Sequence, residues 1–337
     1  MRKVYYNKQH DEILDLTSIV GNIVIADHMN GFDNTGRNTL LDHISKVAVD
    51  VVTVWHDEII VDGILQNYPN LNFKFLFPIF IWEIADEYPR SPRHYQNFVC
   101  SFNGSPHISR QFLTAAIHKF NWFDPQYTSK NFISSRHTID GNLQQYCLGD
   151  TEAFYRKFII DETAQADTFY NSKIQLAYDP ETTHTKHSTN IQLLEKQINQ
   201  SFVHVVSETL ATSYYPFVTE KFLYSILNKG LFITYGQPNW HAHIEKYYGF
   251  KLYKKIFNYS FDSITNPVER LVEMLTMISK FSMLSRDELD DLYRLEHETI
   301  EFNYNHYKSG DYIKCLEKHN ESPVRVLHGL DGNVDEL

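Results

Sequence analysis

The fold is decided by residues 203–236, VHVVSETLATSYYPFVTEKFLYSILNKGLFITYG. An apolar run that ends at Glu208 is typical of a short buried strand followed by a polar loop. Helical spacing begins after Thr219, a predicted N-cap, and Gly230 is predicted to stop that helix. Residues 231–235 form a second apolar run typical of a strand. The stretch is therefore predicted to be a strand, a helix and a parallel strand, the repeating unit of α/β folds.

Two charged residues, Glu220 and Lys221, open the predicted helix just beyond the carboxyl end of a strand. Open α/β sheets bind their ligands at such ends. A lysine at a helix start opposes the helix dipole, and a bound anion would offset that cost. The pair therefore predicts a phosphate site, with a surface lysine beside a glutamate as the alternative. Glu208 has two interpretations, a polar residue beside the ligand or a carboxylate that caps the following loop.

Length and composition exclude several classes of protein. The chain has 337 residues, 42% hydrophobic and 22% charged, which suits two soluble α/β domains. No apolar run approaches the ~20 residues of a membrane span, and the first residues lack the apolar segment of a secretory signal. Three widely spaced cysteines predict neither disulfides nor a zinc cluster, and favour the cytoplasm. The net charge of −11 argues against a non-specific nucleic-acid coat.

Strand patterns alternate with helical patterns along the whole chain, which predicts a doubly wound α/β protein. Two prolines in residues 89–93 indicate the first linker. We therefore predict an N-terminal domain over residues 1–93, a second domain over residues 94–285, and a helical extension over residues 286–337 that packs back on the first domain.

Further elements are predicted from periodicity and capping residues. Strands are expected at residues 19–26, 49–54, 73–80 and 98–102, and a strand with an edge loop at residues 250–257. Helices are expected at residues 109–120, 191–200 and 239–248, after Asn266-Pro267, and as one long helix over residues 285–304.

The central stretch resembles the donor-binding region of fucosyltransferase-like glycosyltransferases of the GT-B architecture. The matching text is Ser207-Glu208-Thr209, then Phe-Val-Thr-Glu-Lys at residues 217–221, then Phe-Ile-Thr-Tyr-Gly at residues 232–236. Residues 98–103, Phe-Val-Cys-Ser-Phe-Asn, followed by Arg110, are similar to the family's strand, turn and helix-opening arginine. The resemblance covers roughly residues 97–285. Thr209 stands where the family has Asn-Ser, which leaves the donor's identity open.

This resemblance implies two Rossmann-like domains whose parallel sheets face each other across a cleft. The second domain would bind a nucleotide sugar of the UDP or GDP type, and the reaction would be inverting. Glu220 would bind the ribose hydroxyls, and Lys221 and Arg110 would hold the diphosphate. The donor-binding residues implied in full are Arg110, Glu208, Thr219, Glu220, Lys221, Tyr235 and Gly236.

A direct displacement also needs a general base for the acceptor hydroxyl. The N-terminal domain offers carboxylates and a histidine at predicted strand ends, namely Asp27, His28, Asp33, Glu58, Glu83 and Asp86. Asp27, Glu83 and Asp86 are the catalytic candidates, with Asp27 first, although a loop aspartate that caps a turn is the alternative for each. The sequence contains no Asp-x-Asp triplet, so metal-independent chemistry without a cofactor is expected.

The acceptor class stays open between a glycan and a hydroxymethylated DNA base, as in phage DNA modification. The protein is expected to act in the cytoplasm, or in the host cytoplasm if the protein is viral. No membrane partner is expected. The alternative is a non-catalytic nucleotide-sugar-binding protein or a structural virion protein. His241 and His243 do not share a helix face, so they are expected to be unrelated surface and packing residues rather than a metal site.

Overall fold

The computed structural model describes residues 90–103, 108–130, 187–208, 211 and 218–319, and the backbone of four short strands nearer the N-terminus. The chain divides into two compact units, one formed by Met1–Ile79 with Ile313–Leu337 and the other by Phe80–Tyr312. Helices and parallel strands make the protein α/β. The predicted domain boundaries at residues 93 and 285 stay a prediction.

The first unit contains a parallel sheet of four strands in the order β1-β2-β3-β4. These strands are β1 (Val4–Tyr6), β2 (Ile23–Ile25), β3 (Asp50–Thr53) and β4 (Asn72–Phe75). The predicted strands at residues 19–26, 49–54 and 73–80 each overlap one of them. In the described parts of the chain, no helix is long and apolar enough to cross a membrane.

The second unit is built on another parallel sheet, with strand order β6-β5-β7-β8. Its strands are β5 (Asn97–Asn103), β6 (Thr128–Lys130), β7 (Ser201–Ser207) and β8 (Leu231–Tyr235). Every residue of β7 and β8 is buried, because helices cover both faces of the sheet. This explains why these strands read as continuous apolar runs. The short edge strand β6 was not predicted.

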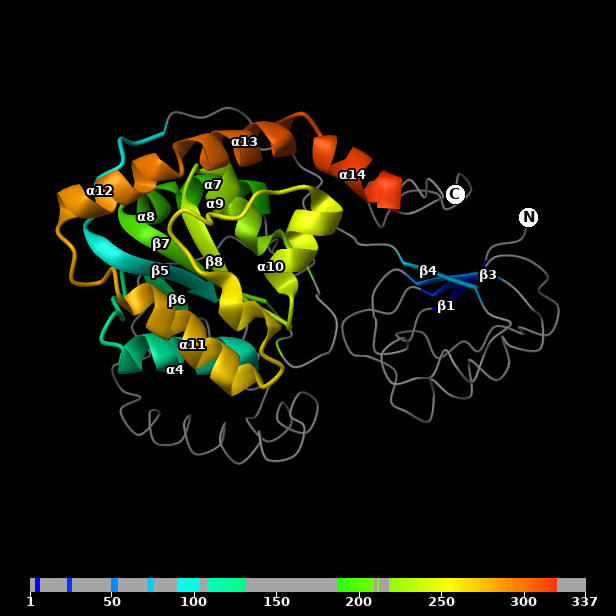
Figure 1. Cartoon of the computed structure of the whole chain (residues 1–337), viewed down its shortest axis with the longest axis horizontal. Coiled ribbons are helices and arrows are strands. Elements are labelled where there is room, and N and C mark those ends of the chain that lie inside the picture. The colour runs from blue at the N-terminus through cyan, green and yellow to red at the C-terminus, as the bar shows by residue number, and fades with distance from the viewer. Residues whose placement is uncertain are drawn as a thin grey trace. The chain divides into compact units, whose positions relative to one another are not determined.

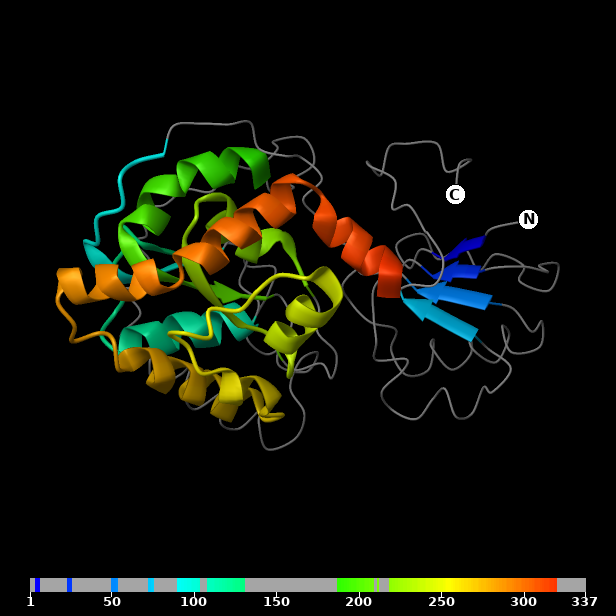
Figure 2. The ribbon, with the colours of Figure 1, turned by 45° about the horizontal axis from the view of Figure 1, so that its top comes forward.

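Helices lie on both sides of this second sheet (Figures 1 and 2). One face carries α4 (Ile108–Lys119) and α11 (Pro267–Ser279). The other carries α7 (His187–Leu193), α8 (Glu195–Asn199), α9 (Leu223–Leu227) and α13 (His297–Lys308). The predicted helix over residues 191–200 is thus two helices, because the chain turns at Leu194.

The segment between β7 and β8 has the predicted order of elements, with two differences. Thr219 occupies the N-cap position, but the helix opens as a 3-10 turn, η4 (Glu220–Phe222), before α9 begins. At the other end, Lys229 takes the left-handed conformation with φ 52°, in place of the expected glycine. Glycine is required at residue 230 for a different reason, because a Cβ there would lie only 2.5 Å from Cγ2 of Ile198.

The C-terminal helices begin where capping residues predict. Asn266 accepts hydrogen bonds from the backbone of Val268 and Glu269 at the start of α11. Ser285 forms a capping box at the start of α12 (Arg286–Leu295). The single long helix expected over residues 285–304 is wrong, because the chain turns at Glu296, whose buried carboxylate accepts the backbone N–H of Lys255. A further helix, α14 (Asp311–His319), follows α13.

The strand expected at residues 250–257 is also wrong. The side chain of Asn303 on α13 accepts the backbone N–H of Lys251 at 2.8 Å and donates to its carbonyl at 2.9 Å. One amide side chain thereby replaces the strand partner that this backbone would need. The preceding helix is confirmed as α10 (Trp240–His243) continued by the π-helix η5 (Ile244–Tyr248), and Gly249 ends it with φ 75°.

Candidate functional site

The connections that leave β5 and β7 run in opposite directions. From β5 the chain passes through α4 to β6 on one side, and from β7 it passes through η4 and α9 to β8 on the other. The carboxyl ends of β5 and β7 are therefore a topological switch point, where open α/β sheets bind ligands. We call the ends of β5, β7 and β8, with the residues that follow them, the carboxyl edge.

Glu208 follows β7 at this edge and has no exposed surface. Its Oε1 atom accepts the backbone N–H of Thr219 at 3.0 Å, and its Oε2 atom accepts the Thr219 hydroxyl at 2.5 Å. Burial raises the pKa of the Glu208 carboxyl, an effect that the nearby Lys221 and the bonds from Thr219 partly offset. Both carboxylate oxygens thus hold the start of η4. Of the two predicted interpretations of Glu208, these contacts match the carboxylate that caps the following loop.

Lys221 extends this group of contacts towards the surface. Its Nζ atom donates to the Thr219 hydroxyl at 2.8 Å and to Glu220 Oε1 at 3.2 Å, and lies 4.0 Å from Glu208 Oε2. The lysine side chain is 16% exposed. Two of its three ammonium protons are thereby directed to described residues. The two carboxylates already offset the unfavourable position of this cation at a helix start.

Helix α4 reaches the same place from the other strand. Ser109, in the first turn of α4, donates its hydroxyl to the carbonyl of Glu208 at 2.9 Å. The next residue, Arg110, is buried, and its carbonyl accepts the Thr114 hydroxyl. Glu208 therefore bonds to the starts of both α4 and η4, and the first turns that contain Arg110 and Lys221 meet around it.

The remaining predicted donor residues form the end of β8. Tyr235 is fully buried and its hydroxyl donates to the carbonyl of Pro267 at 3.2 Å. Gly236 lies against Glu208, since a Cβ on this glycine would be 3.4 Å from Cγ of Glu208 and 2.8 Å from Cδ1 of Trp240. The lack of a side chain at Gly236 thus leaves room for both Glu208 and Trp240 beside the end of β8.

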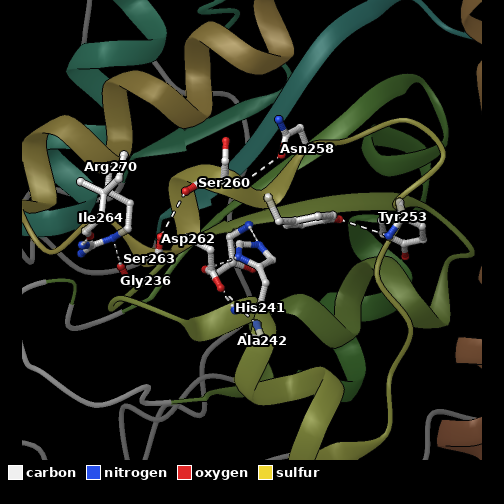
Figure 3. Close-up of polar contacts among 12 residues, drawn as sticks. Gly236, His241, Ala242, Tyr253, Asn258, Ser260, Asp262, Ser263, Ile264 and Arg270 are labelled. Atoms are coloured by element: carbon white, nitrogen blue, oxygen red, sulfur yellow. Dashed lines mark hydrogen bonds and ion pairs between the residues drawn. The ribbon is translucent and has the colours of Figure 1, made fainter.

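A second buried polar group lies beside the end of β8 (Figure 3). The carboxylate of Asp262 accepts the ring Nδ1–H of His241 at 2.7 Å and the backbone N–H groups of His241 and Ala242 at 3.1 Å each. The other ring nitrogen of His241 accepts the backbone N–H of Thr234 in β8 at 3.1 Å, so it carries no proton. Both ring nitrogens of His241 are thus bonded within the fold, and His241 and His243 are both buried, so neither is the surface histidine that was expected.

Asp262 is held in its charged form by the same contacts. Burial alone would raise the pKa of the Asp262 carboxyl, but the His241 ring and the two backbone N–H groups keep that pKa below its ordinary value. The carboxylate thereby lies at the N-terminal end of α10, where negative charge is favourable.

Sequence reasoning missed two residues at this edge, Ser109 and Arg270. Ser109 has no signal beyond its position next to Arg110. Arg270 does have a sequence signal: it is a charged residue on the buried face of α11, with Leu271 and Met274, where helical spacing predicts an apolar residue. The catalytic candidates Asp27, Glu83 and Asp86 lie outside the described residues.

Comparisons with known proteins give no independent assignment: no protein-family model, no curated protein and no solved structure matches this chain. Among the residues that the structure describes, no three His, Cys, Asp or Glu side chains are grouped so as to hold a metal ion.

Proposed function

We propose that the chain is an inverting, metal-independent glycosyltransferase that transfers a sugar from a UDP- or GDP-type donor to an acceptor hydroxyl. The supporting observation is that Glu208 bonds to the first turns of α4 and η4 at the switch point between β5 and β7. This arrangement gathers Arg110 and Lys221 where a phosphate-bearing ligand is expected in this class of fold.

The chemistry of sugar transfer suits these residues. Negative charge accumulates on the diphosphate as the glycosyl bond breaks, and fixed cations beside it lower the barrier. In the proposal Arg110 and the third ammonium proton of Lys221 serve the diphosphate, and Glu220 serves the ribose hydroxyls. In the proposal, the buried Glu208 holds Thr219 and Lys221 in place for the donor.

The proposal includes an N-terminal Rossmann-like domain, residues 1–93. Its parallel sheet faces that of the nucleotide-sugar-binding domain across a cleft, as in the GT-B architecture. The N-terminal domain binds the acceptor and supplies the base, Asp27 first, with Glu83 and Asp86 as alternatives. The acceptor is a glycan or a hydroxymethylated DNA base, the second as part of viral DNA modification in the host cytoplasm.

A thermal-shift panel of UDP, GDP, ADP, CMP and their sugars tests the donor site. We expect one nucleoside diphosphate and its sugar to raise the melting temperature of the wild type but not of Lys221→Ala or Arg110→Ala. Transfer of labelled sugar to a hydroxymethylcytosine duplex and to glycan acceptors then tests the reaction. Stabilisation without transfer or hydrolysis would indicate a non-catalytic binding protein, and no nucleotide effect would indicate a structural protein.

A further inference from the structure

Arg270 is a buried arginine on the apolar face of α11, only 1% exposed. Its guanidinium donates to four backbone carbonyls: to Gly236 at 3.0 Å, to Thr265 at 3.2 Å, and to Ile264 and Ala211. Figure 3 shows Arg270 beside Gly236 and Ile264.

These carbonyls belong to three separate segments. Ala211 lies in the loop after β7, Gly236 directly follows β8, and residues 264 and 265 precede α11. A buried carbonyl without a donor is costly, and a guanidinium offers five N–H donors in one plane. Lysine, with a single nitrogen atom, cannot reach all four oxygens. One side chain therefore fastens together the ends of two neighbouring strands and the start of a helix.

The fastened segments are the ones that position Glu208. Its backbone N–H donates to the carbonyl of Tyr235 at 2.9 Å, and its side chain packs against Gly236. Ala211 follows only three positions later in the chain. A shift of the loop after β7 relative to β8 would therefore move Glu208, and with it Thr219 and Lys221.

We propose that Arg270 is a positioning residue for the nucleotide site, fixing the loop after β7 onto the end of β8 so that Glu208 holds Thr219 and Lys221 where a nucleoside diphosphate binds. The identity of the ligand in this inference rests on the proposed function, whereas the role of Arg270 in fixing the loop does not. Arg270 acts through Glu208 and does not contact the ligand.

Arg93 provides a matched control at the opposite ends of the same strands. Its guanidinium donates to the carbonyls of Ser201 at 3.4 Å and Lys229 at 3.1 Å, and to Asn199 Oδ1 at 3.3 Å. It also lies 4.2 Å from the ring centre of Tyr293. Arg93 thus fastens backbone segments in the way that Arg270 does, but next to the strand starts rather than the candidate site.

The experiment compares Arg270→Lys with Arg93→Lys in the full chain by hydrogen exchange without ligand and by calorimetric titration with UDP and GDP. Both variants are expected to lose several degrees of melting temperature. In Arg270→Lys alone, peptides covering residues 208–222 should exchange at least about tenfold faster and the affinity for the nucleoside diphosphate should fall about tenfold, because lysine leaves some of the four buried carbonyls without a donor. Equal exchange and equal affinity in the two variants would overturn the inference.

Two further outcomes separate this inference from the proposed function. If neither nucleotide binds the wild type, the proposed function fails, and the exchange of residues 208–222 alone decides the role of Arg270. If Arg270→Lys does not fold, native-state exchange of the wild type in urea decides it. Peptides covering residues 208–222 and 264–275 should then open together with one urea dependence, and independent opening of the first set would contradict the role.

Discussion

The two edges of the second sheet use cations in different ways, although the amino edge also holds a buried carboxylate, Glu195, which accepts hydrogen bonds from Ser91 and Asn199. At the amino edge, formed by the residues just before β5, β7 and β8, cations lie half-buried over tyrosine rings. Arg90 and Lys229 both face the ring of Tyr304, at 4.8 and 4.7 Å from its centre. Lys229 also forms an ion pair with Glu301 at 2.7 Å. These contacts fasten α13 to the sheet while water still solvates the charges, so they are inexpensive to form.

At the carboxyl edge the charges are buried or nearly so. Glu208 has no exposed surface, and Arg110, Glu220 and Arg270 are each less than 10% exposed. Desolvation makes such charges costly, and an apolar arrangement of similar volume is often equally stable. The cations of the amino edge are therefore partly solvated, whereas the carboxyl edge gathers several buried charges around Glu208. This difference is one reason why we propose a ligand site at the carboxyl edge.

The strongest test replaces one lysine at each edge. Lys221→Ala is expected to lower sugar transfer by ~10²–10³-fold, as removal of one charge-stabilising donor typically does. Lys229→Ala should leave transfer unchanged and lower the unfolding free energy by about 1 kcal/mol, because its ion pair and ring contact are both partly exposed. Transfer assays and urea unfolding of both variants measure this. Equal transfer by the two variants would remove the distinction between the edges.

The next largest effect concerns acid stability at the carboxyl edge. The folded protein holds the pKa of Asp262 below the ordinary 3.8, so its charge adds stability that is present above pH 3.8 and is lost as pH falls through the lower folded value. Asp262→Asn should cost about 1.5–3 kcal/mol at pH 7, the usual contribution of hydrogen bonds to a charged group. The deficit should shrink below pH 3.8.

Urea unfolding of the wild type and Asp262→Asn between pH 7 and 2.5 measures this dependence. Asp290→Asn, which removes an exposed ion pair to Arg294, is the control and should change the free energy by at most about 0.5 kcal/mol. A deficit for Asp262→Asn that stays constant over the whole range would show that the buried network does not depend on the charge of Asp262.

A glycine from each edge gives a third comparison. A Cβ at Gly230 would lie 2.5 Å from Ile198 Cγ2, and one at Gly236 would lie 2.8 Å from Trp240 Cδ1 and 3.4 Å from Glu208 Cγ. Gly230→Ala and Gly236→Ala should each lower the unfolding free energy by about 1–3 kcal/mol through overpacking. Gly236→Ala alone should also weaken nucleoside diphosphate binding, measured by calorimetric titration, since it displaces Glu208. Unchanged affinity in Gly236→Ala would show that the position of Glu208 does not affect nucleoside diphosphate binding.

Much of the second unit's architecture follows from its sequence. The strands β5, β7 and β8 are apolar runs bounded by polar turns, and helix α11 begins at Asn266 and Pro267 as its cap predicts. Such elements are fixed by local burial and capping, which one segment of sequence reveals. One helix boundary and one strand were predicted wrongly because their partners are distant: Glu296 accepts the N–H of Lys255, and Asn303 bonds both backbone groups of Lys251.

The candidate site likewise has features that the sequence predicts and features that it does not. Lys221 was singled out because a cation at a helix start opposes the helix dipole, and Glu220 and Arg110 because they match the motif of the resembled family. Both signals are visible in a few residues of sequence. The contact that brings the helices of these three residues together, from the Ser109 hydroxyl to the Glu208 carbonyl, joins residues 99 positions apart. The four carbonyls bound by Arg270 come from segments 5 to 59 positions away. Long-range contacts of this kind have no local signature.

The smallest expected effect concerns Glu208 itself. Glu208→Gln keeps the shape of the side chain and removes its charge. Because burial raises the folded pKa of Glu208 above the ordinary 4.5, the folded protein holds this proton more tightly than the unfolded chain. The stability of the wild type relative to Glu208→Gln should therefore fall as pH rises from 4.5 through the folded pKa, which urea unfolding between pH 4 and 8 would show.

The sign of that slope decides between two views of the carboxyl edge. If the wild type loses stability relative to Glu208→Gln as pH rises, the ionised carboxylate is kept at a cost, as expected for a residue that positions Thr219 and Lys221 for a ligand. If the wild type gains instead, the attraction between Glu208 and Lys221 outweighs desolvation. The pair would then stabilise the fold as Lys229 and Glu301 do, and the contrast between the two edges would no longer favour a site at the carboxyl edge.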